Sequence, residues 1–161
     1  MVLFLIGSVV GASIAYFLAQ TPTNNSQVSK ASTCPATTEK EIAGLFDRWN
    51  TSLQTGDPEK VLANYSPSAI LLATLANKPR TTPEELKEYF TSFLLKKPFG
   101  TINTRKIALD CNTASDFGTY TFDLVLDGKK TKVPARYSFE YGYKDGEWKI
   151  IHQHSSGMPE K

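Results

Sequence analysis

The chain has 161 residues, 40% of them hydrophobic, and its 18 lysine and arginine residues against 16 aspartate and glutamate residues give a net charge of only +2. Without an apolar leader and a polar linker, about 120 residues remain, which is enough for one domain with a real core and too few for two. The basic residues are scattered rather than clustered, which argues against nucleic acid as a partner. The sequence has no glycine-rich phosphate loop, G-x-S-x-G motif or Cys-x-x-Cys pair, and we expect no cofactor.

Residues 2–19 contain no charged side chain and are just long enough to cross a bilayer as a helix. We interpret residues 1–19 as either a signal peptide or an uncleaved membrane anchor. A basic start is missing, and the Ser13-x-Ala15 cleavage pattern falls inside the apolar run, which favours the anchor. The domain is then expected to be membrane-anchored and to face a non-cytoplasmic compartment, or to be secreted or periplasmic if the leader is cleaved.

Residues 20–37 are mostly Thr, Ser, Asn, Gln, Pro and Ala, a composition that buries too little apolar surface to fold, and we predict a disordered polar linker. Export would bring Cys34 and Cys111 into an oxidising compartment, where two cysteines allow only one pairing. We therefore predict a disulfide that closes a loop of about 77 residues and stabilises the fold by roughly 4 kcal/mol. Two unpaired thiols are the alternative.

The globular domain is predicted to span residues 38–161. Its first half is predicted to contain three helices. Thr38 and Glu41 form a capping box, and Asp57-Pro58 begins a short second helix after Gly56 ends the first. Thr82-Pro83-Glu84-Glu85 has the same cap signature for a third helix. Apolar residues follow the first and third caps at helical spacing: Ile42, Leu45, Phe46, Trp49 and Leu53, then Leu86, Tyr89, Phe90, Phe93 and Leu94.

Strands are predicted for most of the second half. The continuous apolar run 69–75 indicates a buried strand, although so short a run also permits a helix. Residues 117–126 and 136–143 alternate in polarity, and Asp127-Gly128 and Asp145-Gly146 are two-residue hairpin turns. Helices followed by hairpin-linked strands predict an α+β fold, a curved antiparallel sheet wrapped around the first helix. Such a sheet leaves a cavity at its open end, where a small molecule can bind.

The last predicted strand contains both histidines of the protein, His152 and His154. Strict alternation places them on one face with Trp148 and Ile150, and places Gln153 on the other. This makes the strand the candidate site for proton transfer, metal ligation or anion binding near neutral pH. A structural role for the pair is the alternative, and because no third ligand follows from the spacing we expect no metal site.

Three stretches support a family resemblance. These are Glu41-Ile42-x-x-Leu45-Phe46-x-x-Trp49, the Gly56-Asp57 break, and Asp145-Gly146-x-Trp148-x-Ile150-x-His152-x-His154-Ser155-Ser156-x-Met158-Pro159. Together they resemble the association domain of calcium/calmodulin-dependent protein kinase II and its free-standing bacterial relatives. Those relatives are the SgcJ/EcaC type in the SnoaL-like group of the nuclear transport factor 2 superfamily, and the resemblance spans about residues 38–159.

The resemblance implies a cone-like fold of the nuclear transport factor 2 or cystatin-like type, which assembles through its sheet into homodimers or larger homo-oligomers. It implies no kinase activity, because the catalytic His-Arg-Asp and Asp-Phe-Gly motifs are missing. This architecture hosts enzymes and pure assembly modules, so it decides the fold better than the function.

We expect a non-catalytic, homo-oligomerising domain that binds a small anionic or aromatic molecule. A cofactor-independent enzyme of the SnoaL or ketosteroid isomerase type (an isomerase, lyase or hydrolase) with His152 or His154 as base is the alternative, and a purely structural module is a third. Arg136 points opposite to Tyr137 on alternation, so an interfacial position stays open for it. The expected pocket residues are Trp49, Tyr65, Arg80, Tyr89, Arg136, Tyr137, His152 and His154.

Overall fold

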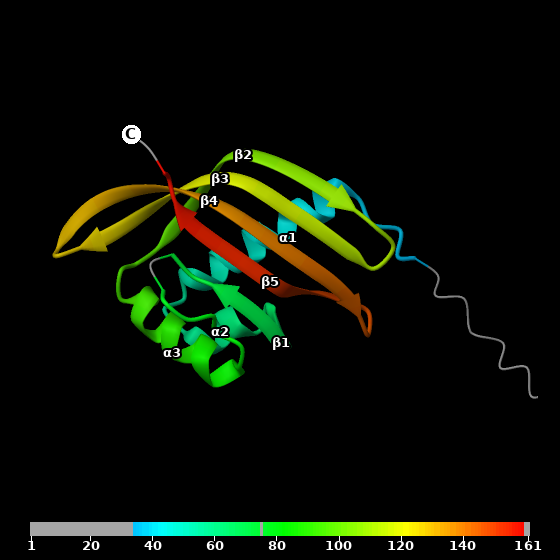
Figure 1. Ribbon diagram of the computed structural model, residues 1–161, viewed down its shortest axis with the longest axis horizontal. Coiled ribbons are helices and arrows are strands. Elements are labelled where there is room, and N and C mark those ends of the chain that lie inside the picture. The colour runs from blue at the N-terminus through cyan, green and yellow to red at the C-terminus, as the bar shows by residue number, and fades with distance from the viewer. Residues whose placement is uncertain (1–33, 75, 160–161) are drawn as a thin grey trace, which may run out of the picture. The chain divides into compact units, whose positions relative to one another are not determined.

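A computed structural model of the protein describes residues 34–74 and 76–159, which form three helices and five strands (Figure 1). The predictions for residues 1–19 and for linker residues 20–33 lie outside the described part of the chain. None of the helices in the described part is long and apolar enough to cross a membrane. The elements in chain order are α1 (Glu39–Leu53), α2 (Pro58–Leu62), β1 (Tyr65–Leu72), α3 (Pro83–Leu94), β2 (Phe99–Leu109), β3 (Thr113–Leu126), β4 (Lys129–Lys144) and β5 (Glu147–Gly157).

The three helices begin at the caps that the sequence predicts. Thr38 Oγ1 accepts a hydrogen bond from the Glu41 N–H at 3.3 Å, and the Glu41 carboxylate accepts one from the Thr38 N–H at 2.7 Å. Thr82 caps α3 in the same reciprocal way, and the Asp57 side chain caps α2. Each cap satisfies backbone N–H groups that lack a partner within the helix, and so fixes where the helix starts.

The five strands form one sheet in the order β1-β5-β4-β3-β2. The predicted antiparallel sheet is confirmed for β2 to β5, but β1 pairs with β5 in parallel. The antiparallel prediction is therefore wrong at this edge, because β1 joins the far end of the chain rather than a neighbour in sequence. The strand also begins earlier than predicted and is buried on one face only, since Ile70 and Leu72 are exposed.

Both predicted hairpin turns are present. Asp127 and Gly128 have φ angles of 49° and 76°, and Asp145 and Gly146 have 54° and 87°, the left-handed values that a two-residue turn requires. The hairpin of β3 and β4 extends beyond the ends of β2 and β5 (Figure 1).

Helix α1 lies across one face of the sheet, which we call the inner face, and the opposite outer face is free of described helices (Figure 1). On the inner face the Phe139 ring is fully buried and lies 6.0 Å from the Phe46 ring and 5.2 Å from the Trp49 ring, between centroids. The core is therefore the layer between the helices and the inner face, as an α+β fold requires.

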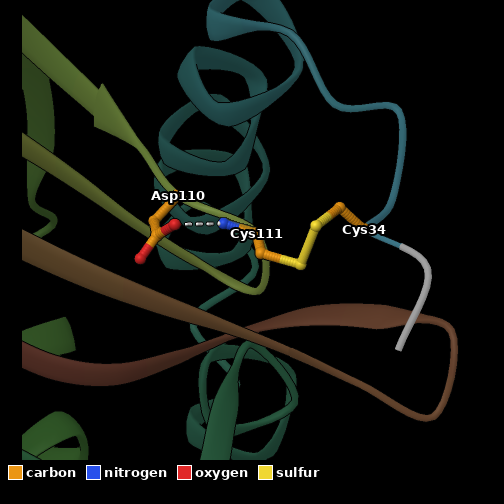
Figure 2. Close-up of a disulfide and its surroundings, with 3 residues drawn as sticks. All are labelled: Cys34, Asp110 and Cys111. Atoms are coloured by element: carbon orange, nitrogen blue, oxygen red, sulfur yellow. Dashed lines mark hydrogen bonds between the residues drawn. A yellow bond between two sulfur atoms is a disulfide. The ribbon is translucent and has the colours of Figure 1, made fainter. Parts of the chain in front are cut away.

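The predicted disulfide is confirmed. Cys34 and Cys111 are bonded, with their Cα atoms 4.7 Å apart (Figure 2). The bond fixes the segment before α1 to the turn between β2 and β3, where the Cys111 N–H also donates to Asp110 Oδ1 at 2.7 Å. Because such bonds persist in oxidising compartments, the disulfide indicates an extracytoplasmic location.

Candidate functional site

A cavity of about 270 Å³ lies between α3 and the inner face of the sheet. Its wall is mainly aromatic, and the rings come from three elements: Trp49 of α1, Tyr89, Phe90 and Phe93 of α3, and Tyr120 and Phe122 of β3. Aliphatic side chains of the β3–β4 hairpin, Leu124, Leu126, Val133 and Ala135, complete the apolar part. This volume is near the lower end of the range for ligand pockets, roughly 300 to 1,000 Å³, so it suits a small molecule.

The periodicity of two elements brings the aromatic rings together. Tyr89 and Phe93 are four residues apart on α3 and stack with their centroids 5.6 Å apart, and Tyr120 and Phe122 are two apart on β3 at 4.8 Å. The Phe93 ring meets the Phe122 ring edge-on at 5.5 Å and joins helix to sheet. These contacts join the rings of the wall to one another around the cavity.

One part of the wall is polar. Ser155 of β5 accepts two hydrogen bonds at its Oγ, from the Tyr120 hydroxyl at 2.6 Å and from the Thr74 hydroxyl at 2.7 Å. Burial raises the pKa of Tyr120 well above its usual value and that of Tyr89 to about 12, so both phenols keep their protons. Ser92 of α3 and Lys96, two residues after the end of α3, are the other polar residues on the wall.

The two imidazoles lie on the other face of the sheet. The pairing of β4 with β5 shifts between Tyr141↔Ile150 and Glu140↔His152, which leaves Ile151 as an extra residue. A bulge of this kind reverses the alternation, so the prediction that His152 and His154 share a face with Ile150 is wrong. Gln153 is buried and Ser155 reaches the cavity, whereas the two histidines pair with Glu140 and Ser138 on the outer face.

Both predicted arginines lie away from the cavity wall. Arg136 is exposed on the outer face and donates to Ser156 Oγ at 3.1 Å. Arg80 forms a bridge with Leu71 beside β1, and its charge partly offsets the rise in the pKa of Tyr89. The guanidinium groups therefore do not supply a counter-charge within the wall.

Tyr65 and Tyr137 are buried on the inner face but do not line the cavity. The Tyr65 hydroxyl accepts from Trp49 Nε1 at 2.9 Å and donates to the Gln153 side chain. Of the eight predicted pocket residues, the structure brings only Trp49 and Tyr89 to this cavity.

Tyr137 belongs to a second polar group, which we call the Asp116 cluster: Arg105, Asp116 and Tyr137. Asp116 is fully buried on β3, and its Oδ1 accepts from the Tyr137 hydroxyl at 2.8 Å and from Arg105 Nε at 3.1 Å. Burial raises the pKa of this carboxyl, while Tyr137 and Arg105 oppose the rise. The Arg105 guanidinium also lies 5.5 Å from the centre of the Phe46 ring.

Most of the cavity wall was not among the predicted site residues, and of the Asp116 cluster only Tyr137 was. Tyr120, Phe122 and Leu124 were recognisable as one face of a strand, and extending their alternation back to Asp116 indicates a buried carboxylate. Ser155 and Thr74 had no such pattern, because one depends on the bulge and the other lies in the loop after β1. In the described part of the chain, no group of three or more His, Cys, Asp or Glu side chains could hold a metal ion.

Residues 38–159 match the sequence profile of the calcium/calmodulin-dependent protein kinase II association domain. The chain belongs to this association domain family. A candidate association domain of the same kind from Xanthomonas campestris has 48% sequence identity and a TM-score of 0.75, over 80% of this chain and 94% of that one. No curated protein matches the sequence.

More distant structures support the fold. A nuclear transport factor 2-like superfamily protein from Salmonella enterica has 19% identity and a TM-score of 0.66, over 76% of this chain and 92% of that one. A protein with a cystatin-like fold from Novosphingobium aromaticivorans has 9% identity and a TM-score of 0.63, over 76% and 82%. The predicted family and fold of this association domain are thus confirmed.

Proposed function

We propose that this association domain forms homo-oligomers through the outer face of its sheet and holds a small aromatic molecule in its cavity, without a catalytic role. The main observation in support is the cavity wall, which brings aromatic rings from α1, α3 and β3 around a hollow of about 270 Å³. Aromatic walls give a flat ligand a large contact area with little loss of side-chain freedom.

The polar groups on the wall support binding rather than acid/base chemistry. The described residues that line the cavity include no imidazole and no carboxylate, and the Tyr89 and Tyr120 phenols have raised pKa values. A general base needs a pKa near the working pH and hydrogen-bond reach of the substrate. The alternative of a histidine base therefore has no support from the positions of His152 and His154.

The outer face supports the oligomeric part of the proposal. Strand register places Leu72, His154, Ser138 and Phe117 in one row across β1, β5, β4 and β3. Leu72 and Phe117 are 37% and 43% exposed, so apolar side chains flank the imidazole in a position where a second copy would cover them. A two-fold contact of this face with itself uses the same patch twice.

Sedimentation of the full chain tests the oligomeric part. We expect the wild type to be a dimer or larger, and Phe117→Glu to be monomeric because it places a charge in the contact. Leu95→Glu is the matched control, since Leu95 is 80% exposed at the end of α3 and not on the sheet. A wild type that stays monomeric at high concentration contradicts the proposal.

The ligand-binding part is tested with small aromatic probes. Binding of ethylbenzene and acetophenone to the full chain is measured by calorimetry, with Ala135→Phe as the blocked variant because Ala135 lines the cavity. We expect the wild type to bind at least one probe and Ala135→Phe to bind neither. Equal binding by both proteins, or no binding by the wild type, rules out the cavity as the site.

A further inference from the structure

We infer that the cavity of this association domain selects aromatic compounds with a carbonyl oxygen, and that Ser155 is the residue that recognises this oxygen. The inference rests on the proposed binding function and goes further, since it names the chemical class of the ligand. It follows from the three hydroxyl groups of Thr74, Tyr120 and Ser155, which are joined by hydrogen bonds on a mainly apolar wall.

The Ser155 hydroxyl is fully used as an acceptor but not as a donor. A serine hydroxyl has one proton to donate and two lone pairs to accept with. Both lone pairs of Ser155 are used, by the Tyr120 hydroxyl at 2.6 Å and the Thr74 hydroxyl at 2.7 Å. What Ser155 still offers to a ligand is its proton.

The other two hydroxyls cannot supply a second proton while they donate to Ser155. Burial raises the pKa of Tyr120, so its phenol stays a donor throughout the neutral range. Two donors directed at one oxygen polarise its O–H bond, which makes Ser155 a stronger donor than an isolated serine. Ser155 thus presents one polarised proton to the cavity, and a ligand satisfies this proton best with an acceptor oxygen.

The rest of the wall determines which carbon skeleton can carry that oxygen. Trp49, Phe90, Phe93 and Phe122 surround the hollow with rings, and its volume of about 270 Å³ limits the ligand to one or two rings. An apolar ring next to a single acceptor describes an aromatic ketone, aldehyde, ester or carboxylate. A ligand without the acceptor leaves the Ser155 proton unpaired on binding, at a cost in affinity.

The test compares two probes that differ at one position. Acetophenone has a carbonyl oxygen where ethylbenzene has two hydrogens, and both are titrated into the full chain by calorimetry. We expect the wild type to bind acetophenone more tightly than ethylbenzene. Ser155→Ala should weaken the binding of acetophenone by roughly 2- to 10-fold without weakening the binding of ethylbenzene. Tyr120→Phe and Thr74→Val each remove one donor to Ser155. They are expected to weaken the binding of acetophenone by less than Ser155→Ala does.

Ser156→Ala is the matched control, because Ser156 is the adjacent serine on the same strand and accepts from Arg136 on the outer face. This variant is expected to bind both probes with the same affinity as the wild type. Equal affinity of the wild type for the two probes, or a selective loss in Ser156→Ala, overturns the inference. If both probes bind equally and Ala135→Phe blocks both, the proposed binding function stands and only the role of Ser155 fails. If neither probe binds, the binding function itself fails.

Discussion

The inner face of the sheet has a closed end and a hollow end. At the closed end, Asp116 of β3 is fully buried and bonded to Tyr137 and Arg105. Only four residues further along the same strand, Tyr120 lines the cavity. The same strand thus packs tightly at one end and leaves a space of about 270 Å³ at the other.

The difference between the two ends shows which part of the inner face can still form contacts with a ligand. At the closed end Asp116 Oδ1 has two partners within the protein, Tyr137 and Arg105, as a buried charge requires, whereas Oδ2 of the same carboxyl has no hydrogen-bond partner among the described residues. At the hollow end the rings lack atoms on one side and lose dispersion contacts that a ligand can restore. Stability should therefore depend on the closed end, and binding on the hollow end.

The disulfide is the strongest test of the closed end, because Cys111 lies in the turn that leads into β3, the strand that carries Asp116. Replacing Cys34 and Cys111 together by serine should lower the free energy of unfolding by about 4 kcal/mol, since the unfolded chain is no longer cross-linked over 77 residues. Urea unfolding measures the loss, and probe binding by the folded variant should not change. A loss near zero contradicts this role of the disulfide.

Arg105→Met tests the charge pair directly. The Arg105 side chain is 23% exposed and Asp116 has no exposure, so removal of the guanidinium leaves a buried carboxylate with only Tyr137 as partner. We expect a loss of about 3 kcal/mol in the free energy of unfolding, measured with urea.

The control for Arg105→Met is the double variant Arg105→Met with Asp116→Leu. It removes both charges and should recover most of the loss, because no unpaired charge remains. A double variant less stable than Arg105→Met shows that packing, and not the charge pair, dominates at this position.

Much of the fold could be predicted because its determinants are local. The capping boxes at Thr38 and Thr82 and the Asp-Gly turns each specify a start or a reversal within four residues, and the structure confirms all of them. The pairing of Cys34 with Cys111 followed from the predicted export to an oxidising compartment together with the presence of only two cysteines. The parallel pairing of β1 with β5 joins segments about 85 residues apart, and no local pattern specifies it.

The candidate site was harder because it depends on which face a strand presents. One extra residue at Ile151 exchanges the faces of everything after it, so His152 and His154 turn outward and Ser155 turns inward. Sequence alternation cannot detect a bulge when polar residues occupy both faces, as they do from His152 to Ser156. The apolar rings of α3 and β3 were visible as stripes, but a stripe alone does not tell a packed core from a cavity wall.

Two alanines allow the same substitution at each end. Ala114 at the closed end and Ala135 at the hollow end are both 3% exposed on the inner face. Ala114→Phe should cost about 1 to 3 kcal/mol, because the added ring has no space, whereas Ala135→Phe should cost less than about 1 kcal/mol, because its ring enters the cavity. Thermal or urea unfolding measures both, and an equal loss at the two sites contradicts the division into a packed and a hollow end.

The smallest effect is a dependence on pH at the closed end. Because burial raises the pKa of Asp116 above the ordinary value of 3.8, the folded protein holds this proton to a higher pH than the unfolded chain. The protonated carboxyl stabilises the fold fully below the unfolded pKa, and this contribution is lost as the pH rises through the folded pKa. Asp116→Asn keeps a neutral side chain at every pH. The free energy of unfolding of the wild type, minus that of the variant, should therefore fall as the pH is raised above about 4.

Glu85 provides the control of opposite sign, since hydrogen bonds from Thr81 lower its pKa and its contribution is lost on acidification instead. Urea unfolding between pH 3 and pH 7 measures both variants, Asp116→Asn and Glu85→Gln, against the wild type. A difference for Asp116→Asn that stays constant or rises with pH contradicts the raised pKa.

The hollow end should behave differently from the closed end. The described residues on its wall include no carboxyl group, so the affinity of the folded protein for acetophenone should stay constant over the range in which the contribution of Asp116 changes.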